Sequence, residues 1–304
     1  MLVEIQLIAI VVAVACALPG VFLVLRSMTM LSDAITHTVL LGIVLAFFAT
    51  QDLNSPLLML GATLVGVATV WVIGALQRTK LLSGDAAIGI VFPLFFSIAI
   101  ILITRYAGSV HLDTDSVLMG ELAFAPFKRT QLFGMDIGPQ ALWTMIVILL
   151  INSVFILLFY KELKLSTFDA ALAAALGFSP VLLHYGLMSL VSLTAVGAYD
   201  SVGSVLVVGF MVGPALTGYL LTRQLHHMIW VTVITAVINS IVGVQLAFAV
   251  DASLAGMIAV VTGVTAFAAF LFSPEKGWLK KTLRRSKQQK KLYKWKTKQE
   301  MEQR

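Results

Sequence analysis

The stretch TMLSDAITHTVLLGIVLAFFA, residues 29–49, is long and apolar enough to cross a membrane as a helix. About 20 apolar residues span the hydrocarbon core of a bilayer. Two ionisable residues, Asp33 and His37, interrupt the stretch. Such groups are costly inside a bilayer, and they mark positions where an ion, a proton or a substrate meets the protein. The stretch therefore predicts a transmembrane helix that carries a functional site.

The rest of the chain also has the composition of a membrane protein. Of its 304 residues, 59% are hydrophobic and only 12% are charged, which is too few charges to cover a soluble protein. We expect an all-α polytopic membrane protein with eight or nine transmembrane helices. The predicted spans are residues 5–25, 29–49, 57–76, 86–104, 141–160, 181–199, 203–221, 228–249 and 253–272.

Basic residues in the short connections predict the orientation of these spans. Lys and Arg favour the cytoplasmic side of a membrane. If every span crosses, all the basic clusters fall on one side, which places the N-terminus outside and the C-terminus in the cytoplasm. These clusters are Arg26, Arg78 with Lys80, Lys161 with Lys164, Arg223 and the C-terminal tail.

The chain divides by charge into two regions, a transmembrane domain of residues 1–274 and a basic cytoplasmic tail of residues 275–304. The tail carries 12 Lys or Arg residues against 3 Glu. Basic clusters next to a membrane bind anionic lipid, and nucleic acid is a weaker interpretation because the tail already lies beside anionic headgroups. The residues expected at the lipid surface are Lys280, Lys281, Arg284 and Arg285.

Asp33 and His37 are four residues apart, so both project from one face of a helix. If the helix starts near Ser27, His37 lies about 15 Å along it, close to the middle of the bilayer. A carboxylate and a neutral imidazole suit first-row divalent metals better than sodium or an organic solute. The alternative is a hydrogen-bonded pair that only ties two helices together.

Other residues are weaker candidates for chemistry. His184 lies just inside the sixth span and could add a metal ligand, although an interfacial histidine is the simpler interpretation. Cys16 lies in an apolar segment and is expected to be a buried hydrophobe. The sequence contains no zinc-hydrolase pattern, which disfavours an intramembrane protease.

Two connections are too rich to be plain turns. The outer one, residues 105–139, carries Asp113, Asp115 and Glu121, and its apolar middle, residues 117–127, is expected to pack back against the membrane. The acidic residues could attract cations, dock another protein, or form ordinary surface. The inner connection contains FDAALAAALG, residues 168–177, which has the signals of a short capped helix and of a docking element.

Four segments together resemble the permease subunits of bacterial metal-ion ABC importers, the manganese, zinc and iron group. They are SDAITHTVLLG at 32–42, HLDTDSVLMGE at 111–121, FDAALAAALG at 168–177 and VGSVLVVGFMVGPA at 202–215. The second segment is similar to the manganese and iron branch. The likeness runs from about residue 15 to residue 274 in matching order.

The resemblance implies the fold of the cobalamin and siderophore permeases, in the plasma (inner) membrane of a bacterium. It implies three partners: an extracellular metal-binding lipoprotein, a cytoplasmic ABC ATPase and a second permease chain, identical or related. Asp33 and His37 would contact the transported Mn²⁺, or Fe²⁺ or Zn²⁺, and no permanently bound cofactor is implied. The residues that would contact the ATPase are Phe168, Asp169, Ala173, Leu176 and Gly177.

Several positions depart from the family pattern. Leu41 stands where the family usually has proline, which puts a helix kink there in doubt. Gly209 replaces an alanine and forms a GxxxG motif with Gly213, which permits close packing of another helix, with a gating hinge as the alternative. Leu216 and Thr217 replace small residues, so packing in that span is expected to differ.

The leading hypothesis is therefore the permease of an ATP-driven divalent-metal importer. The chain has no G-x-x-x-x-G-K-[ST] loop, so ATP hydrolysis would take place on a separate subunit and the chain itself would not be an enzyme. One alternative is a proton-coupled secondary transporter that uses Asp33 and His37 as a proton relay. A membrane scaffold anchored by the basic tail is a further alternative.

Overall fold

The computed structural model of the chain describes residues 1–51, 55, 57–106, 122–132, 135–273 and 277. In this part of the chain nine helical segments are long and apolar enough to cross a membrane, which confirms the predicted spans. The helices that contain them are α1 (Leu2–Leu25), α2 (Thr29–Thr50), α3 (Leu57–Arg78), α4 (Gly84–Tyr106), α6 (Gln140–Leu158), α9 (Pro180–Leu221, two spans), α10 (Leu225–Val250) and α11 (Leu254–Phe272).

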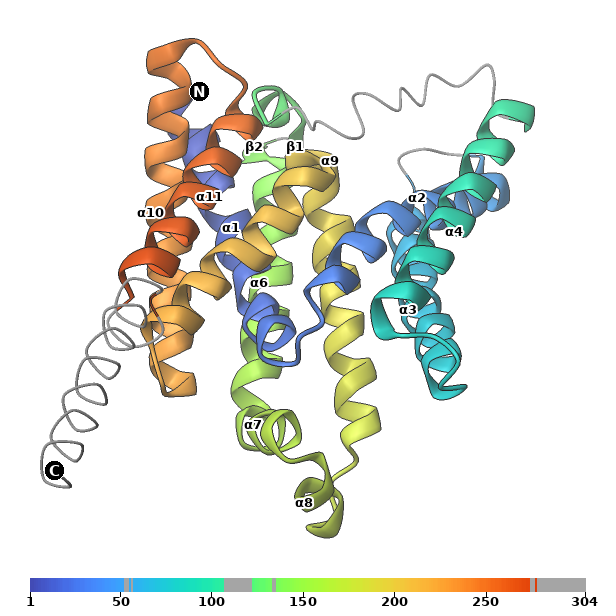
Figure 1. Cartoon of the computed structure of the whole chain (residues 1–304). Coiled ribbons are helices and arrows are strands. Elements are labelled where there is room, and N and C mark those ends of the chain that lie inside the picture. Colours follow the sequence, from blue (N-terminus) through green and yellow to red (C-terminus); the bar gives the residue numbers. More distant parts are fainter. Residues whose placement is uncertain (52–54, 56, 107–121, 133–134, 274–276, 278–304) are drawn as a thin grey trace, which may run out of the picture.

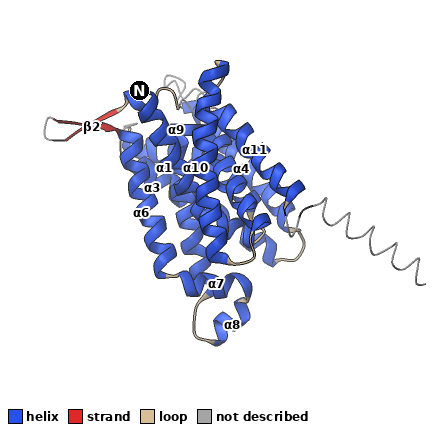
Figure 2. Ribbon diagram, turned by 90° about the vertical axis from the view of Figure 1, so that its left-hand side faces the viewer, coloured by secondary structure: helices blue, strands red, loops and turns tan. Residues whose placement is uncertain are grey.

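Short elements lie at the two ends of the bundle (Figure 2). The 3₁₀ turn η1 (Ala125–Phe127) and the antiparallel strands β1 (Arg129–Leu132) and β2 (Met135–Pro139) lie at the end that carries the N-terminus. Helices α7 (Tyr160–Phe168) and α8 (Ala170–Ala175) project from the opposite end, which we call the α8 end. Among the described residues this two-stranded sheet is the regular structure that differs from the predicted all-α fold.

The helix α9 contains a break that separates its two spans. Gly203 has φ of 75° and ψ of 164°, a conformation that residues other than glycine rarely adopt. Figure 1 shows that the chain reverses direction near this break, so both ends of α9 lie toward the α8 end. The sequence predicted two spans here, at 181–199 and 203–221, and the structure joins them at a sharp corner with almost no loop.

The helix α1 forms the centre of one group of helices and packs against α6, α9 and α10. More than half of its residues are buried. Helices α2, α3 and α4 pack mainly against one another, and α2 and α3 contact α9. The outer helices expose large apolar side chains such as Leu64, Trp71 and Leu157, which is the surface that hydrocarbon favours.

The GxxxG motif of α9 has one glycine at a helix contact and one in open space. A Cβ atom at Gly213 would lie 2.2 Å from Cγ2 of Thr262 on α11, whereas a Cβ at Gly209 would meet only Cδ1 of Leu206, at 4.0 Å. Close packing against α11 therefore explains why glycine occupies position 213. The backbone break in α9 lies at Gly203 rather than at either glycine of the motif.

We expect alanine to have opposite effects at these two glycines. Gly213→Ala forces Thr262 to move, and overpacking of this kind costs about 1–3 kcal/mol. Gly209→Ala should stabilise the helix by up to about 1 kcal/mol, because alanine has the higher helix propensity. Thermal unfolding of the purified protein in detergent measures both effects, and equal melting temperatures for the two variants would contradict this packing.

Candidate functional site

Asp33 and His37 lie on one face of α2, one helical turn apart. The Nε2 atom of His37 is 3.5 Å from Oδ1 of Asp33. The side chain of His37 is 21% exposed and that of Asp33 is 48% exposed. At 1.5 Å per residue, His37 lies roughly 12 Å from the first residue of α2, near the middle of the helix. The pair is therefore loosely joined and partly open, with His37 near the middle of α2 and Asp33 one turn closer to its start.

Two phenylalanines of α4 hold the imidazole of His37. The ring centroid of Phe92 is 5.0 Å from that of His37, at an interplanar angle of 36°. Phe96 makes an edge-on contact with centroids 5.8 Å apart. These rings restrict the rotation of the imidazole, because offset and edge-on aromatic contacts have preferred geometries.

The hydroxyl side chains around the pair are buried and hydrogen-bonded. The hydroxyl of Thr36 donates to the backbone carbonyl of Asp33 at 2.8 Å. The hydroxyls of Thr38 on α2 and Thr69 on α3 are 2.9 Å apart and hydrogen-bonded. The bond between Thr69 and Thr38 joins α3 to α2 one residue after His37.

The pair does not gain a third metal ligand from the rest of the described chain. Among those residues no group of three His, Cys, Asp or Glu side chains could hold a metal ion. His184, the weaker candidate, is not brought together with Asp33 and His37. The centroid of its ring lies 5.4 Å from that of Tyr185, the next residue of α9.

The predicted capped helix is present as α8. The Oδ1 atom of Asp169 accepts a hydrogen bond from the backbone N–H of Leu172 at 2.9 Å, which is an N-cap. At the other end Gly177 has φ of 86°. Its N–H bonds the carbonyl of Ala174, and the N–H of Phe178 bonds the carbonyl of Ala173, which together form a Schellman motif.

The α8 segment presents apolar side chains away from the bundle. The exposed fractions are 64% for Phe168, 46% for Leu172 and 60% for Leu176. Ala173 is fully buried and faces the packed side of the helix. Exposed apolar residues that gather on a projecting element are typical of a protein-docking surface. We call Phe168, Leu172 and Leu176 the α8 apolar patch.

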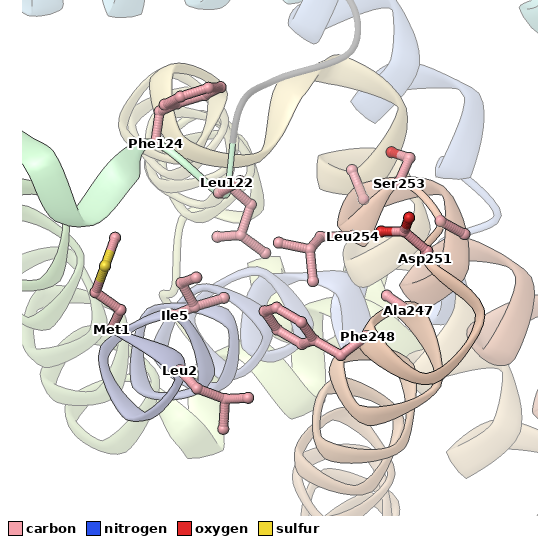
Figure 3. Close-up of a pocket in the computed structure, with 13 residues that line it drawn as sticks. Met1, Leu2, Ile5, Leu122, Phe124, Ala247, Phe248, Asp251, Ser253 and Leu254 are labelled. Atoms are coloured by element: carbon pink, nitrogen blue, oxygen red, sulfur yellow. The ribbon is translucent and has the colours of Figure 1, made fainter.

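A cavity of about 620 Å³ lies beside the N-terminus and the turn between α10 and α11 (Figure 3), which Figure 1 shows at the end of the bundle opposite α8. It is lined by the start of α1, by Leu122 and Phe124, and by the turn between α10 and α11. Asp251 is the acidic residue among its lining side chains, which are mostly apolar. The described residues that line the cavity therefore do not form a metal site. Leu122, Ala125 and Pro126 are buried, as expected for the end of the apolar segment 117–127.

Several predicted residues lie outside the described part of the chain. These residues are Asp113, Asp115 and Glu121 of the outer connection and Lys280, Lys281, Arg284 and Arg285 of the tail. The predictions made for them stay predictions.

A family model described as the ABC 3 transport family matches residues 1–273. The chain belongs to this family. The match covers all nine spans and the α8 segment, and it ends where the basic tail begins.

Individual relatives agree with this membership of the ABC 3 transport family. The chain is 47% identical over 283 residues to the zinc transport system membrane protein TroD of Treponema pallidum, covering 93% of this chain and 77% of the relative. It is 43% identical over 281 residues to the manganese transport system membrane protein MntD of Bacillus subtilis, covering 92% and 95% of the two chains. The chain is therefore a multi-pass membrane permease of a bacterial ABC transport system.

A solved structure from Streptococcus pneumoniae, PsaBC in complex with Fab, has the same fold. The TM-score is 0.75 at 27% sequence identity, and the match covers 92% of this chain and 94% of that chain. This match confirms the predicted fold class of an ABC permease.

Sequence reasoning missed Phe92, Phe96 and Leu172. The two phenylalanines are four residues apart in a span full of apolar residues, so their spacing alone did not distinguish them from lipid-facing positions. Leu172 lies within the alanine run, four residues before Leu176 and four after Phe168. The spacing of Leu172 and Leu176 is a signal that could have found part of the α8 apolar patch, whereas Phe168 ends α7 and the extended residue Asp169 separates it from α8.

Proposed function

We propose that this chain is the permease of an ATP-driven importer of divalent first-row metals. Manganese is the favoured transported metal, followed by iron or zinc. The observation that carries the proposal is the Asp33–His37 pair within the membrane span of α2, in a chain of the ABC 3 transport family. Mixed oxygen and nitrogen ligands suit all three metals, and the names of the relatives include both zinc and manganese.

A second permease chain completes the site in this proposal. The carboxylate of Asp33 is nearly half exposed in the isolated chain, and an acidic side chain within a membrane span rarely faces lipid. A second copy, or a related permease, covers this face and leaves a conduit between the two chains. Two such pairs would supply two carboxylates and two imidazoles, a complete set of protein ligands for one ion.

The transported ion binds only transiently in this arrangement. The 3.5 Å contact between Nε2 of His37 and Oδ1 of Asp33 is weak, so the two groups separate readily to admit a cation. When the ion leaves, the pair closes again and each group regains a partner. The phenylalanines beside His37 keep its imidazole in place through the cycle.

The α8 apolar patch is the proposed docking site for a separate ATPase subunit, on which ATP hydrolysis takes place. In this proposal the α8 end faces the cytoplasm and the N-terminus lies outside. The basic clusters support this orientation, because Arg26, Arg78 and Arg223 lie at the C-terminal ends of helices that end toward α8. The opposite end, with β1 and β2, would receive metal from an extracellular lipoprotein.

ATP-dependent uptake tests the proposal against the proton-coupled alternative. We expect a nucleotide-binding subunit to co-purify with the full chain from its native membrane. Vesicles containing that complex should take up radioactive Mn²⁺ only with ATP inside the compartment that faces α8. Uptake should persist when a protonophore collapses the pH gradient. Uptake without ATP that the protonophore abolishes would overturn the proposal.

A further inference from the structure

Arg26 connects the turn before α2 to the last turn of α7. Its Nε atom donates a hydrogen bond to the hydroxyl of Thr167 at 3.1 Å, and its Nη2 atom donates one to the hydroxyl of Ser166 at 3.0 Å. The two ends of this contact are about 140 residues apart in sequence. The contact is therefore tertiary, and it joins two elements that the chain itself does not connect.

Both ends of the contact lie close to a functional segment. Thr167 is followed by Phe168 and by Asp169, the N-cap of α8. Arg26 ends α1 and is followed by Ser27 and Met28, after which α2 begins with Thr29. Asp33 is the fifth residue of α2. The contact thus joins a residue seven positions before Asp33 to a residue two positions before the N-cap of α8.

The turn between α1 and α2 is short and internally bonded. The N–H of Ser27 bonds the carbonyl of Val24 at 3.1 Å, and the N–H of Met28 bonds the carbonyl of Leu23 at 2.9 Å. Ser27 has φ of 56°, so the turn takes a tight left-handed course. Because this connection is short and restrained by hydrogen bonds, a displacement of Arg26 also displaces the first turn of α2.

The chemistry of the contact suits an element that moves. In the part of the chain that the structure describes, no ion pair forms on Arg26, and its acceptors are two neutral hydroxyls. Hydrogen bonds to hydroxyls are weaker than a bidentate ion pair, so they can break and form again during a cycle. The two donors of one planar guanidinium also fix the orientation of the Arg26 side chain relative to α7, whereas a lysine ammonium does not fix it.

We infer that Arg26 is a positioning residue that transmits movement of α7 and α8 to α2, and so couples the ATPase to the Asp33–His37 pair. The inference rests on the proposed function. It adds a specific mechanical link, because docking of the ATPase on α8 alone does not say how the metal site responds.

The test separates coupling from assembly and from ATP hydrolysis. The permease with its co-purifying nucleotide-binding subunit is reconstituted in vesicles as the wild type, Arg26→Gln, Arg26→Lys, and the double variant Ser166→Ala/Thr167→Val. Three quantities are measured: the amount of bound subunit, the rate of ATP hydrolysis and the amount of Mn²⁺ taken up per ATP. Arg78→Gln, at an exposed arginine of the same end, and Lys164→Gln, at an exposed position of α7, are the controls.

We expect Arg26→Gln and the double variant to keep the bound subunit and to hydrolyse ATP, while Mn²⁺ uptake per ATP falls at least about tenfold. Arg26→Lys keeps the charge but loses one of the two directed bonds, so it should restore coupling only in part. The two controls should match the wild type. If Arg26→Gln does not fold, the near-isosteric double variant, which retains Arg26, decides the matter.

Uptake per ATP within twofold of the wild type in the double variant would overturn the inference, because Arg26 would then not act through α7. The same result in Arg26→Gln would overturn it as well. Failure of the proposed function looks different: the wild type itself would show no ATP-driven uptake, and the inference would fall with it.

Discussion

Asp33→Ala is expected to lower metal uptake at least about a hundredfold, because loss of even an outer-shell partner of a metal site costs about 10–100-fold in affinity. The carboxylate is the proposed oxygen ligand, and the structure offers no other acid that joins His37 among the described residues. Asp33→Asn should give nearly the same loss, since it keeps the shape of the side chain and removes its charge. Uptake of radioactive Mn²⁺ into vesicles that contain the complete transporter measures the effect.

Two controls show whether the loss of metal uptake is specific to the Asp33–His37 pair. Asp85→Asn removes an exposed carboxylate from the first turn of α4 and should leave uptake unchanged. The bound ATPase subunit should be retained by Asp33→Ala, because Asp33 lies on α2, away from the α8 apolar patch. Normal uptake by Asp33→Ala would remove the pair from the transport pathway.

Leu176→Asp is expected to weaken binding of the ATPase subunit by at least about thirtyfold, which corresponds to the roughly 2 kcal/mol of an interface hot spot. Leu176 is 60% exposed in this chain and would become buried against the partner. A carboxylate at that position would lose its hydration without gaining a counter-charge. The amount of ATPase subunit that co-purifies with the permease measures the change.

Leu81→Asp is the matched control for this substitution. Leu81 is also an exposed leucine, it lies in the turn between α3 and α4 toward the α8 end, and it is outside the α8 apolar patch. Leu81→Asp should retain the subunit. Because both leucines are exposed, neither change should alter the melting temperature of the isolated permease by much. Equal loss of the subunit from both variants would argue against docking on α8.

The sequence predicted the transmembrane helices and the α8 segment well, for physical reasons. A span of apolar residues as long as α1 or α11 has few alternatives in a bilayer, because its backbone groups must bond within the helix. The ends of α8 are set by local chemistry, with Asp169 bonding the N–H of Leu172 and Gly177 taking a positive φ. Such short-range signals are visible in the residues themselves.

The corner of α9 and the surroundings of His37 were harder to predict. Gly203 lies among other glycines and serines, and only the packing of the two halves of α9 selects it as the break. Phe92 and Phe96 meet His37 because α4 packs on α2, a tertiary contact that hydropathy does not encode. The same holds for Arg26, which the sequence indicated only as a mark of orientation and which the structure joins to α7.

The proposed site also needs more than one chain holds, and here neither the sequence nor a single folded chain suffices. Asp33 and His37 give two ligands from one helix, and two ligands rarely complete a site for a divalent ion. The half-exposed carboxylate of Asp33 marks the face where the missing ligands would have to come from.

Electron spin-echo spectroscopy of Mn²⁺ bound to the complete transporter tests the central claim most directly, because it detects nitrogen atoms bonded to the ion. With one equivalent of Mn²⁺ per transporter, we expect ¹⁴N couplings from a coordinated imidazole in the wild type. These couplings should be lost in His37→Gln and kept in His184→Gln. Bound Mn²⁺ without nitrogen couplings in the wild type, or with unchanged couplings in His37→Gln, would contradict the assignment of His37 and Asp33 as the place where the metal meets this chain.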